Sequence, residues 1–510
     1  MIKNMSIKNL FITSLTVLII IILIVFFVKG NVGNPIAFQN DNDARVTGPF
    51  EATNSSSRYA LIQALVDNKT PFFNDKLAGF SAPDISYYNG HYISIFTPGV
   101  SFLGIPFYII GKYIGFPQLI TYMLTLFSLF LNFFLVFKLS QKFVTNRYAS
   151  LIGALIFVFA TNSLAYALTL TQHQISTSII LLALFNALAQ KRTIINNIIL
   201  GALFGIGALV DIPNMFALIP ILIYVFLKHF TVRKTENKLN IGVKISMLAF
   251  VIGLIPFFVL FANYNYQATG SYTKLGQIIG RSNFPNDIKK PETRAKVETN
   301  VPGHPLPLDT RVQLHSFYIL IISNERGVLY YSPVILIGLL GLFMVYRKSE
   351  KSHMGVVLLA TVSMIVVFYS MHGDPWGGWS YGARYMIPVY AILATGIGVV
   401  LTKYKKNLIF LPIFSVLLIY SVYVSILGAL TTNSIAPKVE AINLETPISY
   451  TYEYNQQFVS KNQSSSLVYN LYLKDQVPLS TYLYVLMGVI VILVGINYLL
   501  VIFEVDKNDK

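Results

Sequence analysis

Residues 10–28 read "LFITSLTVLIIIILIVFFV", a run without a single charged side chain. As a helix, such a run is long enough to cross about 30 Å of hydrocarbon. It is longer than the apolar region of a signal peptide, and no small-residue cleavage site follows it. We therefore expect a retained first membrane span.

The composition predicts that more spans follow. Hydrophobic residues make up 54% of the 510 residues and charged residues 12%, which is typical of a polytopic membrane protein. We expect an all-α bundle of about 12 transmembrane helices (range roughly 11–13) that forms one domain over residues 1–510. The apolar runs predict spans at 9–28, 118–137, 149–169, 174–189, 194–210, 212–228, 245–264, 328–346, 355–371, 385–402, 407–430 and 481–503. The chain has no cysteine, so thiol and disulfide chemistry are excluded.

The net charge of +16 follows from membrane topology. If the N-terminus is cytoplasmic, the inner segments carry 20 basic and 5 acidic residues, and the outer segments carry 18 and 17. This distribution satisfies the positive-inside rule, with both termini in the cytoplasm. A nucleic-acid partner is therefore not indicated.

Three long segments fall on the outer side, at 29–117, 265–327 and 431–480. Long loops on one face usually carry the function, so we expect an extracytoplasmic active site. In the first loop, residues 55–73 have helical apolar spacing, and residues 100–116 are apolar but interrupted by Pro106. The first is expected to lie along the membrane surface, and the second to be an interfacial or re-entrant segment that leads into the second span.

Several polar residues of the outer face are functional candidates. The tract "GDPWGGWSYGARY" (373–385) places Arg384 at the start of a span, after both tryptophans and the glycines Gly377, Gly378 and Gly382, where its guanidinium suits a phosphate. His173 and Asp211 lie in or beside apolar runs, where ionisable groups are costly unless a polar cavity receives them. Asp84 precedes a tyrosine-rich turn of a kind that suits a sugar cleft.

Structural alternatives stand beside these interpretations. Tryptophan and tyrosine also form interfacial aromatic belts, and a surface turn accounts for Asp84 equally well. His173 and Asp211 are also compatible with short turns that contact headgroup water. The sequence has no phosphate-binding glycine loop, nucleophile elbow or metal-ligand cluster, so no cofactor is expected, and metal assistance is left open.

Five stretches resemble the GT-C superfamily of membrane glycosyltransferases, in its bacterial dolichyl-phosphate-mannose-protein mannosyltransferase-like and aminoarabinose-transferase-like branch. They are "RYALIQALVDNKT" (58–70), "YYNGHYISIFTPGVSFLGIPFY" (87–108), "NYNYQATGSY" (263–272), "ERGVLYYSPVIL" (325–336) and "GGWSYGARYMIP" (377–388). The resemblance implies an inverting transfer of a sugar, in the hexosyltransferase class, from a polyprenyl-phosphate carrier to an acceptor hydroxyl. The acceptor would be a protein, lipid or polysaccharide, and the enzyme would lie in the plasma membrane.

The resemblance also implies site residues. The donor phosphate would be bound by Arg384, His173 and Arg58, and the cleft would be lined by Tyr88, His91, Tyr92, Trp379 and Tyr381. An Asp-Glu pair that is common in the family is replaced here by Ser55-Ser56. The general base is therefore expected to be Asp84 or Asp43, ahead of Asp41 and Glu51.

Two other functions use the same lipid-linked substrates. A transporter or flippase of lipid-linked glycans predicts charged groups in mid-span and paired broken helices. A glycan polymerase or ligase shares the outer-face site.

Overall fold

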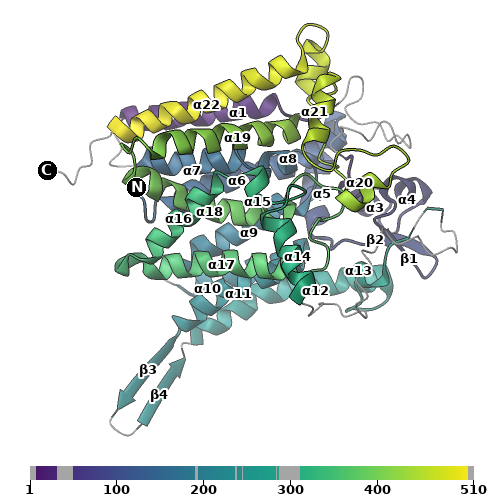
Figure 1. The fold of residues 1–510 in the computed structure, drawn as a ribbon. Coiled ribbons are helices and arrows are strands. Elements are labelled where there is room, and N and C mark those ends of the chain that lie inside the picture. Colours follow the sequence, from purple (N-terminus) through teal and green to yellow (C-terminus); the bar gives the residue numbers. More distant parts are fainter. Residues whose placement is uncertain are drawn as a thin grey trace.

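The computed structural model describes residues 7–30, 50–189, 193–235, 238–243, 245–282, 284–285 and 310–503. Within these ranges, the chain folds as a bundle of roughly aligned helices with a layer of shorter elements at one end (Figure 1). The expected all-α class is confirmed, since strands are confined to two short hairpins.

Twelve helices of the described chain coincide with the twelve predicted spans. They are α1 (Ile7–Val25), α6 (Pro117–Ser140), α7 (Arg147–Phe159), α9 (Gln172–Ala187), α10 (Ile194–Val210), α11 (Pro213–Leu227), α12 (Ala249–Thr269), α16 (Ile335–Tyr346), α17 (Ser352–Met371), α18 (Ile387–Lys403), α19 (Phe410–Leu430) and α22 (Leu479–Phe503). Among the described residues, six helices are both long and apolar enough to cross a membrane: those ending at Ser140, Thr269, Met371, Lys403, Leu430 and Phe503. The other apolar helices are shorter.

Two predicted spans are divided by polar breaks. The run 149–169 becomes α7 and the short α8 (Ser163–Ala167), because the chain leaves the helix at Thr161 and Asn162. The Asn162 amide donates instead to the carbonyl of Tyr381, 3.1 Å away. The run 328–346 likewise becomes α15 (Val328–Tyr331) and α16, with Pro333 between them. Both breaks lie at the end of the bundle where the short elements gather (Figure 1).

Small residues allow a close helix contact in the bundle. Gly201 on α10 and Gly253 on α12 each pack against the backbone of the other helix. A Cβ on Gly253 would lie 1.9 Å from the carbonyl oxygen of Ile198, and a Cβ on Gly201 would lie 1.9 Å from the carbonyl oxygen of Phe250. Membrane helices associate through such small residues because the lipid offers no hydrophobic driving force for their contact.

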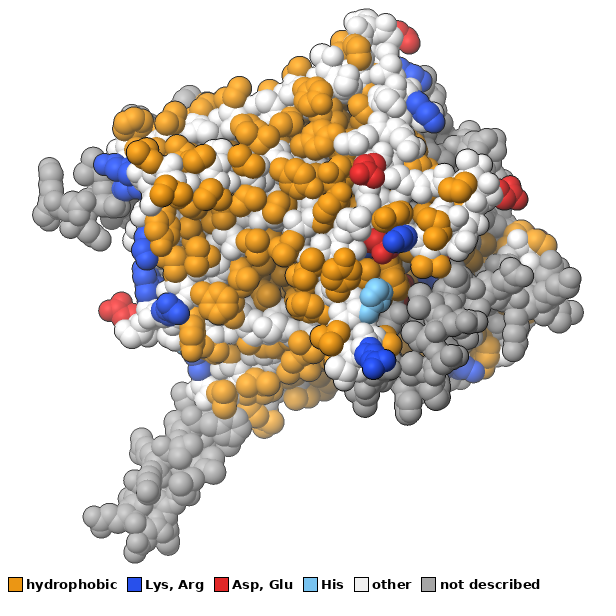
Figure 2. All heavy atoms as spheres, in the orientation of Figure 1, with side chains coloured by type: hydrophobic (Ala, Val, Ile, Leu, Met, Phe, Trp, Pro, Cys, Tyr) orange, Lys and Arg blue, Asp and Glu red, His pale blue; other side chains and the backbone are white. Residues whose placement is uncertain are grey.

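The two ends of the bundle differ in character. Figure 1 places the N- and C-terminal ends and a projecting hairpin of β3 (Phe230–Thr235) and β4 (Lys238–Val243) at one end. Lys and Arg side chains mark that edge in Figure 2, and a broad apolar band separates it from the opposite end. This separation of charge is the one that the sequence-based topology predicts.

The opposite end carries the outer layer. Its first part comprises α3 (Thr53–Val66), α4 (Asp75–Ser81), a hairpin of β1 (Ile85–Tyr88) and β2 (His91–Ser94), and α5 (Gly99–Ile114). The hairpin turn is Asn89-Gly90, and both residues have positive φ, as a two-residue turn of this kind requires. The later parts are α13 (Gly276–Ile279), α14 (Thr310–Ile321), α20 (Lys438–Ile442) and α21 (Glu453–Ser460).

Candidate active site

A cavity of about 870 Å³ opens between the helix ends and the outer layer. Its lining comes from all parts of the chain: the start of α3, the ends of α10 and α17, the loop before α18, and the segments after α12 and α19. Four carboxylates line it, from Glu51, Asp84, Asp211 and Asp374, together with the cationic groups Arg281 and Arg384 and the imidazole of His372. Aromatic side chains complete the lining: Phe96, Phe368, Tyr369, Trp379, Tyr385, Tyr454 and Phe458.

The glycine-rich tract before α18 brings Arg384 to this cavity. Gly377, Gly378 and Gly382 all have positive φ, which side chains disfavour. A Cβ on Gly377 would also lie 2.8 Å from the Arg384 Nε. The tract is held by Asp374, whose Oδ1 accepts from the Gly377 amide at 3.0 Å. These glycines therefore shape the loop around the arginine.

The guanidinium of Arg384 is available for a ligand. It lies over the ring of Tyr385, 5.4 Å from the ring centroid. Its Nε is buried and has no hydrogen-bond partner in the described structure. A guanidinium with unused donors that faces a polar cavity suits an anion such as phosphate.

A second arginine, Arg326, stabilises the glycine-rich tract through hydrogen bonds to its backbone. Arg326 is fully buried, and it donates to the carbonyls of Trp376 (3.2 Å) and Ile435 (2.8 Å). Its neighbour Glu325 accepts from the Trp376 indole at 2.8 Å and from the Lys438 amide at 2.9 Å. This pair has a structural role, since it ties the glycine-rich tract to the segment after α19.

Asp84 lies at the start of the β1–β2 hairpin and lines the cavity. Its Oδ2 accepts from the hydroxyl of Thr53 at 2.7 Å, and its Oδ1 is 2.8 Å from the Nε of Arg281. Because each carboxylate oxygen has two lone pairs, these partners leave acceptor capacity for a substrate hydroxyl.

Arg281 reaches Asp84 because its segment is bound to β1. The hydroxyl of Ser86 donates to the carbonyls of Gly276 (3.0 Å) and Gly280 (2.6 Å), and the amide of Ser282 donates to the carbonyl of Ile85 at 2.8 Å. Sequence analysis missed Arg281. No local motif distinguishes it from the other outer basic residues, and its partner lies almost 200 residues away in the chain.

The inner end of the cavity contains Asp211, which ends α10. The Gln172 amide donates to its Oδ2 at 3.3 Å. A small adjoining cavity is lined by Asp211, His173 and Asn214. His173 is buried between the rings of Tyr166 and Tyr385, and its Nε2 has no partner among the described residues. His173 and Asp211, the two candidates that lie in or beside apolar runs, thus line one small cavity next to Tyr385.

Arg58, the third predicted phosphate ligand, lies behind the residues that line the cavity. It is buried, donates to the carbonyl of Asn54 at 3.0 Å and lies 4.0 Å from the ring centroid of Phe96. Asn54 and Phe96 line the cavity, whereas Arg58 does not. Burial lowers the pKa of the Arg58 guanidinium to about 10, so it stays a cation at neutral pH.

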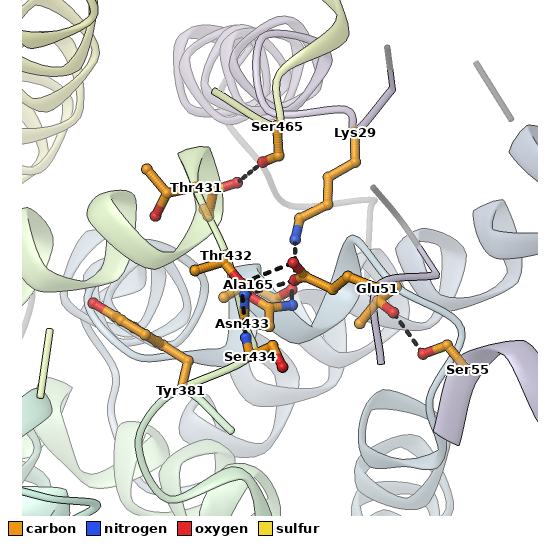
Figure 3. Close-up of polar contacts among 12 residues, drawn as sticks. Lys29, Glu51, Ser55, Ala165, Tyr381, Thr431, Thr432, Asn433, Ser434 and Ser465 are labelled. Atoms are coloured by element: carbon orange, nitrogen blue, oxygen red, sulfur yellow. Dashed lines mark hydrogen bonds and ion pairs between the residues drawn. The ribbon is translucent and has the colours of Figure 1, made fainter. Parts of the chain in front are cut away.

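A buried ion pair closes another side of the cavity (Figure 3). Lys29, just after the first span, lies 3.1 Å from Glu51, and both side chains are almost fully buried. Glu51 also accepts from the Thr432 hydroxyl at 2.8 Å and the Asn433 amide at 2.6 Å. Ser55, at the family's acidic position, shares a hydrogen bond of 2.7 Å with Thr169. Glu51 therefore connects the first span, α3 and the segment after α19.

Of the five predicted cleft residues, Trp379 lines the cavity, and its indole donates to Glu440. Tyr381 is buried below it and donates to the carbonyl of Val424. Tyr88, His91 and Tyr92 lie on the hairpin away from the lining: Tyr88 accepts from Lys274 at 2.9 Å, and His91 stacks on Phe72. Asp41 and Asp43 lie outside the described residues.

No group of three or more His, Cys, Asp or Glu side chains within the described ranges is arranged to hold a metal ion.

No protein-family model matches the chain, and no curated protein sequence matches it. Its structure is similar to two crystal structures of ArnT from Cupriavidus metallidurans, one in the apo state (12% identity, TM-score 0.46) and one bound to undecaprenyl phosphate (11% identity, TM-score 0.47). Both comparisons cover 97% of this chain and 78% of ArnT. The archaeal oligosaccharyltransferase AglB from Archaeoglobus fulgidus, in complex with an inhibitory peptide and a dolichol-phosphate, is similar at 14% identity and a TM-score of 0.42, over 90% of this chain and 60% of AglB. These structures belong to the GT-C class of membrane glycosyltransferases that the sequence motifs resemble.

Proposed function

We propose that the protein is a glycosyltransferase that moves a sugar from a polyprenyl-phosphate carrier to an acceptor hydroxyl. The observation that carries this proposal is that Arg384 and Asp84 line one cavity at the end of the bundle where the long loops gather. Sugar transfer from a phosphate carrier needs a cation at the leaving phosphate and a base at the incoming hydroxyl. The cavity supplies one of each.

In this mechanism, Arg384 binds the phosphate and Asp84 accepts the proton of the acceptor hydroxyl. The acceptor oxygen forms a bond to the anomeric carbon from the face opposite the phosphate. The bond from the anomeric carbon to the phosphate oxygen breaks, and its electron pair stays on the phosphate. The products are an inverted glycoside, a protonated Asp84 and a polyprenyl phosphate.

The remaining lining fits a sugar between these two groups. Aromatic faces such as those of Trp379, Tyr385 and Tyr454 stack on sugar rings, and the nearby amide and hydroxyl groups bind sugar hydroxyls. We propose a hexose as the transferred group and a protein, lipid or polysaccharide as the acceptor. The excess of basic residues on the segments that the topology assigns to the cytoplasm favours an extracytoplasmic site.

Lipid extracts from the source organism with and without the gene test this function. We expect a polyprenyl-phosphate sugar to accumulate in the deletion strain, and a plasmid copy of the gene to remove it. A copy with Arg384→Lys should fail to remove it although the protein accumulates normally in the membrane, because lysine keeps the charge but loses the two-pronged geometry.

Two outcomes would contradict the proposal. If the deletion leaves the pool of polyprenyl-phosphate sugars unchanged, the protein does not consume them. If the lipid accumulates only in the cytoplasmic leaflet, the protein translocates the carrier, which is the flippase alternative.

A further inference from the structure

The four carboxylates of the cavity differ in how firmly they are bound. Glu51 has three donors, Asp84 is held by Thr53 and Arg281, and the Oδ1 of Asp374 accepts from the Gly377 amide at 3.0 Å. The side chain of Asp211 has a single hydrogen bond in the described structure, from the Gln172 side-chain amide at 3.3 Å. Asp211 is therefore the carboxylate of the cavity that is held least firmly by its protein partners.

A local structural role does not account for Asp211. Helix α11 begins at Pro213, and no side chain caps its first turn. Asp211 is half-buried at the cavity wall, where an under-bonded carboxylate is costly because partial desolvation disfavours its charge. A group of this kind beside a cavity is a candidate for a function.

The surroundings of Asp211 are those of the predicted phosphate site. Arg58 and Arg384 are the cations in the electrostatic surroundings of its carboxylate. Asp211, His372 and Arg384 line the same cavity, and Tyr369 and Tyr385 stack on each other beside them, 4.4 Å between ring centroids. A phosphate bound by Arg384 would therefore be placed near a fixed negative charge.

This placement matters because the charge of the phosphate changes during the proposed reaction. The donor is a phosphate diester with one negative charge. When the sugar leaves, the bond electrons remain on the phosphate, and the product is a monoester with a charge of about −1.5 to −2 at pH 7. A neighbouring carboxylate therefore repels the product more strongly than the donor.

We propose that Asp211 discriminates between donor and product and promotes release of the polyprenyl phosphate. The inference rests on the proposed function, since it needs a phosphate at Arg384. Before the donor binds, Asp211 lies in the same cavity as Arg384. After transfer, it weakens the hold of Arg384 on the more highly charged product.

Equilibrium binding to the purified full-length protein tests this role without turnover. The probes are a short polyprenyl phosphate monoester and its methyl diester, which differ by about one charge at pH 7.5. We expect Asp211→Asn to bind the monoester about ten-fold more tightly than the wild type, and to gain distinctly less for the diester. Asp211→Glu keeps the charge and should bind like the wild type.

Two controls separate this inference from the proposed function. Asp475→Asn removes an exposed carboxylate of the outer layer and should leave both affinities unchanged. Arg384→Ala should weaken binding of both probes. The melting temperature of each variant shows that the folded protein is compared.

The outcomes are distinct. If the wild type binds the monoester through Arg384 but Asp211→Asn binds it equally or more weakly, the release role is wrong and the proposed function stands. An equal gain for both probes also contradicts the discrimination. If the wild type binds neither probe, or if Arg384→Ala binds both as the wild type does, the proposed function fails, and the inference fails with it.

Discussion

Lys29 and Glu51 form a buried charged pair in the wall of the cavity. Three donors occupy the Glu51 carboxylate, and the pair is almost completely buried. Removal of one buried partner leaves an uncompensated charge, whereas removal of both leaves none. We therefore infer that Glu51 anchors the chain just before α3, which begins at Thr53, the hydrogen-bond partner of Asp84.

Thermal unfolding of single and double variants tests this view. We expect Lys29→Met to lower the free energy of unfolding by roughly 3–5 kcal/mol, and Glu51→Gln by a similar amount. The double variant should lose less than the sum of the two. Additive losses would mean that the two side chains do not act as a pair.

Individual residues also mark the limit of sequence reasoning. Asp84 and Arg384 were predictable, because each lies in a local tract of tyrosine or glycine that suggests a site. Arg281 was not, since only the pairing of residues 276–282 with β1 brings it to Asp84. Tyr88 was predicted to belong to the cleft, but it does not line the cavity. Tyr88 lies four residues along the chain from Asp84, which corresponds to roughly 13 Å in a strand.

The helices were predictable because the length of an apolar run determines the span that it forms. Each of the twelve predicted spans overlaps a helix of the described chain, although two of them are divided by polar breaks. The packing of these helices was harder to predict from the sequence, because it depends on which small residues meet between neighbouring helices. Gly201 and Gly253 lie on neighbouring helices at a distance that admits no side chain.

A substitution at this contact tests the helix packing. Gly253→Ala places a Cβ 1.9 Å from a carbonyl of α10, so the two helices must separate, and we expect the free energy of unfolding to fall by about 1–3 kcal/mol. Gly488→Ala, on α22, is the matched control. Nothing lies within 4 Å of its added Cβ, and alanine is the better helix former. Equal stability of the two variants would contradict the close contact.

The molecule as a whole is polarised. One end of the bundle carries the chain ends and the basic edge, and the other carries the cavity and the outer layer (Figures 1 and 2). The charge count predicts which end is cytoplasmic, whereas the convergence of distant segments on one cavity required the fold. In the predicted topology, the cavity lies at the extracytoplasmic end of the bundle.

Reporter fusions test the orientation. A fusion after Lys406 should report the cytoplasm, and fusions after Asn68 and Asn462 should report the outside, because the positive-inside rule retains the basic end. A cytoplasmic signal from Asn68 would place the cavity on the inner face and contradict the proposed localisation.

Sugar transfer by the purified protein in liposomes tests the central claim most directly. Given the polyprenyl-phosphate sugar that accumulates in the deletion strain and a membrane extract as the source of acceptor, the wild type should release polyprenyl phosphate and form an inverted glycoside. Asp84→Asn should transfer about 10²–10⁴-fold more slowly, because the amide cannot accept the proton of the acceptor hydroxyl. Wild-type turnover by both Asp84→Asn and Arg384→Ala would contradict the account, since neither group would then serve the reaction.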